Sequence, residues 1–180
     1  MYRAPFAVVL AVLLAVPVVA AETKFSLTGE NTKITFVGTK PGGRHEGGFK
    51  KLSGTATLDG TDAAGLKVEV EVDTESLYAD DAKLTAHLKS PDFFGVKDHP
   101  KATFKTTKVE KTAKGYNITG DLTMLGRTKA VSVPATVTAA GDTLTLTSEF
   151  KINRNDWGMT YGKGKVDDIV SLKVVVNAKK

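Results

Sequence analysis

The sequence of 180 residues contains no cysteine, which excludes disulfides, cysteine–zinc sites, iron–sulfur clusters and thiol nucleophiles. Only three histidines are present, His45, His87 and His99, and their spacing is not typical of a zinc site. A nucleophile motif of the G-x-S-x-G type is also absent. We therefore expect no metal, no cofactor and no catalytic residues, and hence no enzyme.

Blocks of like charge are absent as well. The formal net charge is +5, but the basic residues are spread along the chain. A run of about five or six like charges would indicate an interaction tail. We therefore expect no nucleic-acid partner.

Long apolar runs are confined to the N-terminus. Arg3 precedes an unbroken apolar run, Phe6–Val16, and the small residues Ala20 and Ala21 stand before Glu22. This order is typical of a secretory signal peptide. We expect a signal at residues 1–21, one domain at residues 22–180, no membrane span after cleavage, and a periplasmic or secreted location. An uncleaved N-terminal anchor is the alternative.

Alternation of apolar and polar residues dominates the remaining sequence. Such alternation gives a strand one buried and one solvent-exposed face, which is typical of antiparallel sheets. Eight segments show it, with a further short strand conceivable at Phe25–Leu27: Thr32–Thr39, Lys51–Leu58, Leu66–Val72, Lys101–Lys105, Tyr116–Met124, Val131–Val137, Leu144–Ile152 and Val170–Ala178. The pattern predicts an all-β fold, either an eight-stranded antiparallel barrel, which we favour because closure removes exposed edges, or a sandwich.

Two segments depart from this alternation. Around residues 79–95 the period becomes helical, which predicts a short helical insertion with Asp80 as its N-cap. The glycine-rich stretch Gly42–Gly48 has no phosphate-loop ending and is interpreted as a hairpin-like loop.

Small residues are frequent on the predicted inner face of the barrel. An eight-stranded barrel can either be filled by side chains or hold one small ligand. The small inner residues favour an open apolar lumen, although aromatic side chains could instead pack into the spaces they leave: Gly38, Gly54, Ala56, Ala102, Gly120, Ala135 and Ser148.

Three sequence blocks together resemble the YceI-like family, exported lipocalin-like proteins associated with polyisoprenoid binding. They are Leu88-Lys89-Ser90-Pro91-Asp92-Phe93-Phe94, Pro100-Lys101-Ala102-Thr103-Phe104 and Arg154-Asn155-Asp156-Trp157-Gly158. The resemblance extends from about Phe25 to Ala178. It implies a lipocalin-like barrel that holds a polyprenyl chain, a quinone or a similar amphiphile, and it supplies no catalytic residues.

On this basis the expected ligand is an apolar isoprenoid or quinone lipid. Leu84, Leu88, Phe93 and Phe94 are expected to cap the cavity, and its wall is expected to contain Phe36, Phe104, Tyr116, Ile118, Leu122, Phe150 and Trp157. The alternative is an envelope stress or interaction protein with a filled barrel. The sequence is compatible with either a monomer or a homodimer.

The charged residues near this cavity allow two interpretations. Arg154 and Asp156 are interpreted as a structural ion pair rather than a headgroup site. Arg44, Arg127 and Lys129, expected in loops, are the alternative place for a polar head.

Overall fold

The structure, a computed structural model, describes residues 22–60 and 62–180; the expected signal peptide lies outside them. Within these residues eleven strands form one antiparallel sheet in the order β1-β4-β5-β7-β8-β9-β10-β11-β2-β3-β6. The strands are β1 (Glu22–Thr28), β2 (Thr32–Lys40), β3 (Gly43–Phe49), β4 (Leu52–Asp59), β5 (Leu66–Asp73), β6 (Leu77–Ala79), β7 (Lys101–Thr112), β8 (Gly115–Met124), β9 (Arg127–Ala140), β10 (Thr143–Asn153) and β11 (Ile169–Lys179).

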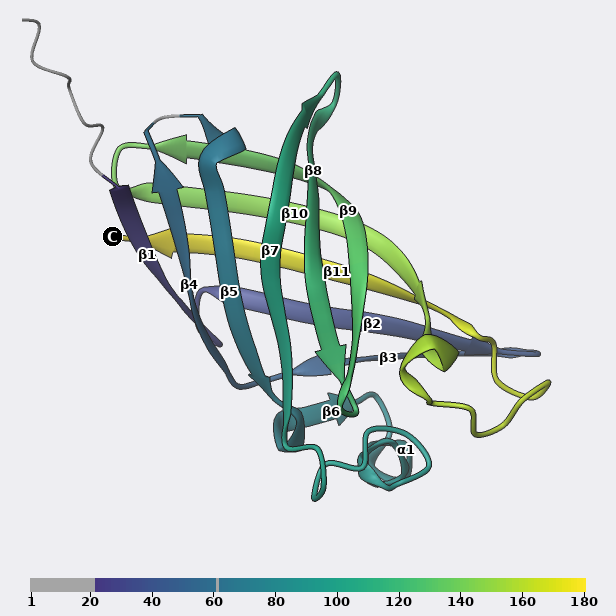
Figure 1. Ribbon diagram of the computed structural model, residues 1–180. Helices are drawn as coiled ribbons and strands as arrows, with labels where there is room; N and C mark the ends of the chain where they lie inside the picture. Colours follow the sequence, from purple (N-terminus) through teal and green to yellow (C-terminus); the bar gives the residue numbers. More distant parts are fainter. Residues whose placement is uncertain (1–21, 61) are drawn as a thin grey trace, which may run out of the picture.

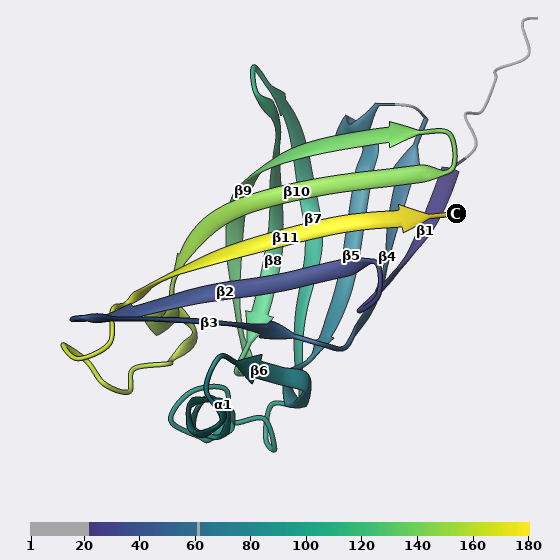
Figure 2. The ribbon, with the colours of Figure 1, turned by 180° about the vertical axis from the view of Figure 1, so that it is seen from behind.

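The sheet curls around a central space (Figures 1 and 2). Its first strand, β1, pairs with β4 and also lies against β11, so the barrel closes there by contact and not by a β-ladder. The all-β antiparallel barrel favoured from the alternating pattern is confirmed, and so is the lipocalin-like form that the family resemblance implied.

The predicted number of eight strands is wrong for the described residues. The short strand considered at Phe25–Leu27 is present as β1, and β3 and β6 are additional. Strand β3 is the glycine-rich stretch interpreted above as a loop, and it pairs with both β2 and β6. Gly47 and Gly48 are required there: a Cβ on Gly47 would lie 2.4 Å from Phe36 Cζ, and one on Gly48 would lie 2.6 Å from the carbonyl oxygen of Ile34. Because Gly47 and Gly48 have no side chains, the Phe36 ring and the Ile34 carbonyl oxygen can lie close to β3 while its backbone pairs with β2 and β6.

One α-helix, α1 (Ala82–Lys89), lies at one end of the barrel (Figure 1) and occupies the insertion predicted around residues 79–95. Its N-cap is Asp81, not Asp80, since the Asp81 carboxylate accepts the backbone N–H of Leu84 at 2.8 Å. Asp80 instead accepts the backbone N–H of Glu46 on β3. Among the described residues no helix has the length and apolar character needed to span a membrane.

In the part of the chain that the structure describes, three 3₁₀-helical turns lie between strands: η1 (Ala63–Gly65), η2 (Thr74–Ser76) and η3 (Arg154–Trp157). The turn η3 follows β10 and ends at Gly158, whose φ of 91° is a left-handed conformation that glycine adopts without strain. The chain then runs as a loop, residues 158–168, back to β11. This loop and α1 lie at the same end of the molecule (Figures 1 and 2).

Candidate ligand-binding cavity

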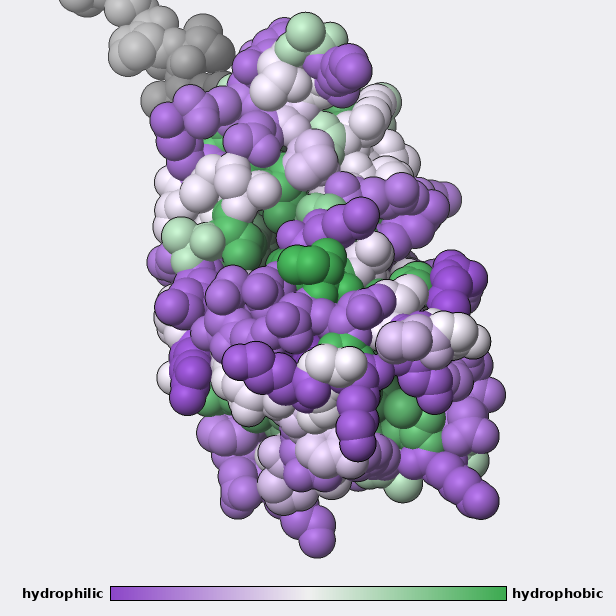
Figure 3. Space-filling model, turned by 90° about the vertical axis from the view of Figure 1, so that its right-hand side faces the viewer, coloured by the Kyte–Doolittle hydropathy of each residue, from purple (hydrophilic) through white to green (hydrophobic). Residues whose placement is uncertain are grey.

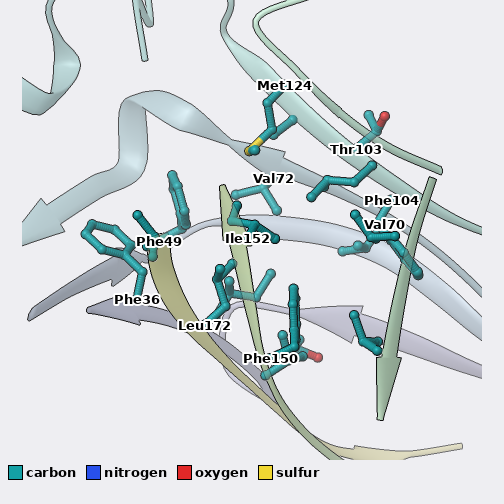
Figure 4. Close-up of a pocket in the computed structure, with 18 of the residues that line it drawn as sticks. Phe36, Phe49, Val70, Val72, Thr103, Phe104, Met124, Phe150, Ile152 and Leu172 are labelled. Carbon is teal, nitrogen blue, oxygen red and sulfur yellow. The ribbon is translucent and has the colours of Figure 1, made fainter. Parts of the chain in front are cut away.

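The barrel encloses an apolar cavity of about 240 Å³. Its lining comes from opposite walls: Phe36 on β2, Val70 on β5 and Leu172 on β11 are among the side chains that converge on it (Figure 4). On the same measure a single water needs roughly 10–15 Å³, so the space accommodates well over a dozen groups of that size. The lumen is therefore open, and a hydrocarbon chain fits its chemistry.

The cavity is packed at one end and open at the other. Inward-facing residues of three adjacent strands change from buried to half-buried in the same direction: Leu144 to Ile152 on β10, Val176 to Val170 on β11 and Thr32 to Gly38 on β2. Ile152 pairs with Val170, and β2 continues this register. The free space therefore widens toward the end that carries the 158–168 loop.

The outside of this end exposes part of the apolar interior. In Figure 3, which views the molecule from the right-hand side of Figure 1, hydrophobic side chains are visible within a recess bordered by hydrophilic ones. Val166 and Asp167 of the 158–168 loop line the cavity here. We refer to this opening as the mouth.

The small residues on the inner face act in two ways. Gly38 lines the cavity, and a Cβ placed on it would meet nothing within 4 Å, so this glycine leaves free space. At Gly120 the space is already filled, because a Cβ there would lie 2.4 Å from Phe104 Cζ. Aromatic packing into glycine positions thus occurs in part of the barrel, while the cavity persists beside it.

Eight of the eleven predicted site residues line the cavity: Phe36, Leu88, Phe93, Phe94, Phe104, Ile118, Leu122 and Phe150. Leu84, Tyr116 and Trp157 do not line it. The Tyr116 hydroxyl donates to Asp62 outside the cavity at 3.1 Å. Trp157 is 2% exposed within the core, and its indole N–H donates to the carbonyl oxygen of Leu122 at 3.0 Å.

Several lining residues were missed by the sequence analysis. Ile34, Val70 and Leu172 lie on the inner faces that the alternation defines, so the pattern already contained them. Phe49 was missed because its glycine-rich surroundings were interpreted as a loop, whereas its ring packs against Phe36 at a centroid distance of 6.1 Å. Met159 and Val166 lie in an irregular loop without a repeating pattern.

Three aromatic rings join the two segments at the mouth. The ring of His87 in α1 lies 5.0 Å from that of Phe93 and 4.8 Å from that of Tyr161, both edge to face. His87 Nε2 also lies 2.9 Å from the Asp92 carboxylate. Since Phe93 lines the cavity and Tyr161 belongs to the 158–168 loop, this cluster connects α1 and the loop across one side of the mouth.

Arg154 fixes the same loop from inside the molecule. Its side chain is 4% exposed, and its guanidinium donates to four backbone carbonyl oxygens, those of Met159, Tyr161, Val166 and Asp167. Its ion-pair partner is Asp168, at 3.5 Å, so the predicted pair with Asp156 is wrong. Because the donors of this fork are already engaged within the protein, Arg154 is a structural residue of the loop.

The three basic residues considered for a polar head do not line the cavity, and they lie in strands, not loops. Arg44 on β3 pairs with Glu46 at 2.6 Å. Arg127 and Lys129 lie on β9, and Arg127 packs over Gly158. No group of acidic residues and histidines among the described residues is suited to hold a metal ion.

Two carboxylates near the ends of the barrel have altered acidity. The pKa of Asp80 lies below its ordinary value, chiefly because the backbone N–H of Glu46 donates to the carboxylate, with His45 3.1 Å away as a further cause. The pKa of Asp62 is lowered by the backbone N–H of Ala64 and then by the Tyr116 hydroxyl. Both groups are exposed and hold local backbone structure rather than facing the cavity.

The fold and the cavity define a class of protein: an antiparallel lipocalin-like barrel with an open apolar interior. The model of the YceI-like domain matches residues 25–178, and the chain belongs to this family.

Relatives agree with this assignment over most of the chain. A UPF0312 protein of Pectobacterium carotovorum is 33% identical over 164 residues, which are 87% of this chain and 85% of the relative. Protein YceI of Escherichia coli is 35% identical over 136 residues, covering 72% and 71% respectively.

Solved structures show the same architecture. BcnA of Burkholderia cenocepacia superposes with a TM-score of 0.75 and 29% identity, covering 82% of this chain and 96% of BcnA. A polyisoprenoid binding domain from Saccharophagus degradans superposes with a TM-score of 0.65 over 87% of this chain and 97% of that domain. At 13% identity the second comparison concerns the fold alone.

Proposed function

We propose that this protein is an exported binding protein that sequesters or carries a long apolar lipid of the isoprenoid type, such as a polyprenyl chain or a quinone. The observation that carries the proposal is the apolar cavity of about 240 Å³, which opens at one end of the barrel. The similarity in fold to a polyisoprenoid binding domain supports the same ligand class. The proposal is one of binding and carriage without a catalytic step.

The energetics of transfer favour such a ligand. Burial of an apolar chain contributes about 0.8 kcal/mol per CH₂, so ten buried carbons contribute roughly 8 kcal/mol before the entropy of binding is deducted. An open mouth allows a polar head to stay in water while the tail is buried. Export rests on the apolar N-terminal segment, residues 1–21.

The alternative is a barrel that acts through protein contacts and has no small ligand. It requires an interior filled by side chains, which holds locally at Gly120 but not at Gly38. The open space beside Gly38 therefore favours the carrier over this alternative.

The first test is identification of a bound lipid. The purified protein is extracted with organic solvent, and the extract is analysed by mass spectrometry. We expect a stoichiometric amphiphile with a long apolar chain. Absence of such a lipid, combined with failure to bind added isoprenoid alcohols, would contradict the proposal.

A second test uses chain length. Binding of isoprenoid alcohols of increasing length is measured by displacement of an apolar fluorescent dye. A cavity of fixed size predicts that affinity rises with each added unit and then levels off when the cavity is full. Affinity that is independent of length would indicate adsorption to the outer surface.

A further inference from the structure

The mouth is surrounded by an unusual set of exposed side chains. Tyr161 and Ile169, 46% and 47% exposed, are two of the three large apolar side chains that the described surface exposes. Both belong to the segment that borders the mouth, Tyr161 within the 158–168 loop and Ile169 directly after it. Between them, the turn Gly162–Lys165 exposes Lys163 and Lys165.

A third lysine joins this set from another strand. The carbonyl oxygen of Thr39 accepts the backbone N–H of Asp167 at 2.9 Å, which holds the β2–β3 turn beside the 158–168 loop. Lys40, the next residue, is exposed at that turn. Both ribbon views show the β2–β3 turn and the loop side by side (Figures 1 and 2). We call Lys40, Tyr161, Lys163, Lys165 and Ile169 the mouth patch.

The charge of the mouth patch is largely uncompensated. None of its three lysines lies in an ion pair with a carboxylate of the described residues. Of the nearby acidic residues, Glu46 pairs with Arg44, and Asp168 lies 3.5 Å from Arg154. Asp167 and Asp156 have no cationic side-chain partner among the described residues, and Asp167 accepts a hydrogen bond from the Thr39 hydroxyl. The lysines therefore outnumber the opposing charge.

We propose that the mouth patch docks the barrel onto an anionic lipid bilayer, with the mouth facing the membrane. Lysines attract anionic headgroups, each raising membrane partitioning roughly fivefold, and a tyrosine ring suits the boundary between water and hydrocarbon. This inference rests on the proposed function. A lipid tail that crosses water between membrane and cavity loses its apolar burial, whereas a docked mouth gives it a continuous apolar path.

The test measures vesicle binding by co-sedimentation at low ionic strength, with vesicles of pure phosphatidylglycerol and of pure phosphatidylcholine. The double variant Lys163→Glu/Lys165→Glu replaces two of the three positive charges of the mouth patch with negative charges. Lys111→Glu/Lys114→Glu is the matched control, since both lysines are exposed near the β7–β8 turn, well away from the mouth (Figure 1). All proteins are prepared identically, so that residues 1–21, where retained, contribute equally.

We expect the wild-type protein to prefer phosphatidylglycerol and to lose this preference at high salt, where charges are screened. In the patch variant the ratio of binding to phosphatidylglycerol over phosphatidylcholine should fall more than about tenfold, and in the control variant it should be unchanged. Tyr161→Ser should weaken binding to phosphatidylglycerol without removing the salt dependence. Equal binding to both vesicles by the wild type, or equal losses in patch and control variants, would overturn the proposal.

Lipid content separates this inference from the proposed function. The patch variant should still contain the bound lipid found by solvent extraction, because none of its substituted side chains lines the cavity. A protein that carries no lipid but binds phosphatidylglycerol through the patch refutes carriage and retains docking. A protein that carries lipid but shows no vesicle preference refutes docking alone.

Discussion

The two ends of the barrel differ in packing, although the same strands run through both. At the closed end, Phe25, Leu144 and Ala178 are at most 1% exposed, and β1 lies against β11. At the mouth, inward side chains of the same strands, such as Phe150 and Leu172, are only half-buried. The alternation of apolar residues continues along both ends, so one sequence pattern supports a packed core and an open cavity.

The difference indicates that the closed end stabilises the fold and that the open end serves ligand binding. Packing at the closed end can supply the stability that the chain needs without disulfides. The open end gives up part of this burial and is held by a few specific contacts, those of Arg154 and of the His87–Phe93–Tyr161 rings. Substitutions at the two ends should therefore separate stability from ligand binding.

The largest expected effect is on stability at the closed end. Phe25→Ala should lower the free energy of unfolding by about 3–5 kcal/mol, because the removed ring leaves a cavity among buried side chains. The midpoint of denaturant unfolding measures it. Phe36→Ala is the matched substitution at the open end, and it should cost clearly less because its ring is already half-buried. Equal losses at both positions would contradict these separate roles of the two ends.

The next effect concerns the loop that borders the mouth. Arg154→Met should destabilise the protein by about 3 kcal/mol, because buried backbone carbonyl oxygens lose their donors. Arg154→Lys should not restore it, since a lysine lacks the planar fork that serves several acceptors. Arg44→Met, which removes an exposed arginine from a surface ion pair with Glu46, is the control and should unfold nearly like the wild type. Thermal unfolding together with proteolysis within the 158–168 loop measures the change.

Filling the cavity should affect binding and spare stability. Gly38→Leu places a side chain in open space, at a strand position without a left-handed φ. Each CH₂ of ligand that it excludes removes about 0.8 kcal/mol, so affinity for an isoprenoid alcohol should fall at least roughly tenfold. Thr147→Leu adds a similar group on the exposed face of β10 and should leave affinity unchanged. Unchanged binding by Gly38→Leu would place the ligand elsewhere.

The strands with clear alternation and the glycine-rich strand β3 also differ in how well the sequence predicts them. Alternation placed Ile118, Leu122 and Phe150 on the inner face, and they line the cavity. The strand rule failed at Phe49, because glycines there lower strand propensity while tertiary pairing with β2 and β6 prevails.

The charges at the mouth were harder to predict. The partners of Arg154 are mostly backbone carbonyl oxygens, which carry no sequence signal, and so its pairing with Asp168 rather than Asp156 could not be anticipated. Trp157 illustrates the same limit: its place in a motif indicated the region, but the direction of its ring depends on η3 and on the carbonyl oxygen of Leu122.

The smallest expected effect is a local loss of structure at each end of the barrel when the pH is lowered. Asp80, just before α1, and Asp62, near η1, both have a lowered pKa because backbone N–H groups donate to their carboxylates. Each stabilises local structure fully above the ordinary pKa of aspartate, and this contribution is lost as the pH falls through the lowered pKa of the folded state. The backbone amide signals of Glu46 and Ala64 in NMR spectra should report the two losses separately.

Substitution by asparagine makes this comparison specific. Asp80→Asn should abolish the acid-dependent change at the Glu46 amide and leave that at Ala64, while Asp62→Asn should do the reverse. If either variant altered both amides, acid would be acting through the whole barrel rather than on one end. Independent titration would instead mean that β3 and β6 can loosen at the mouth while the closed end stays packed, which is the property that entry of a long ligand requires.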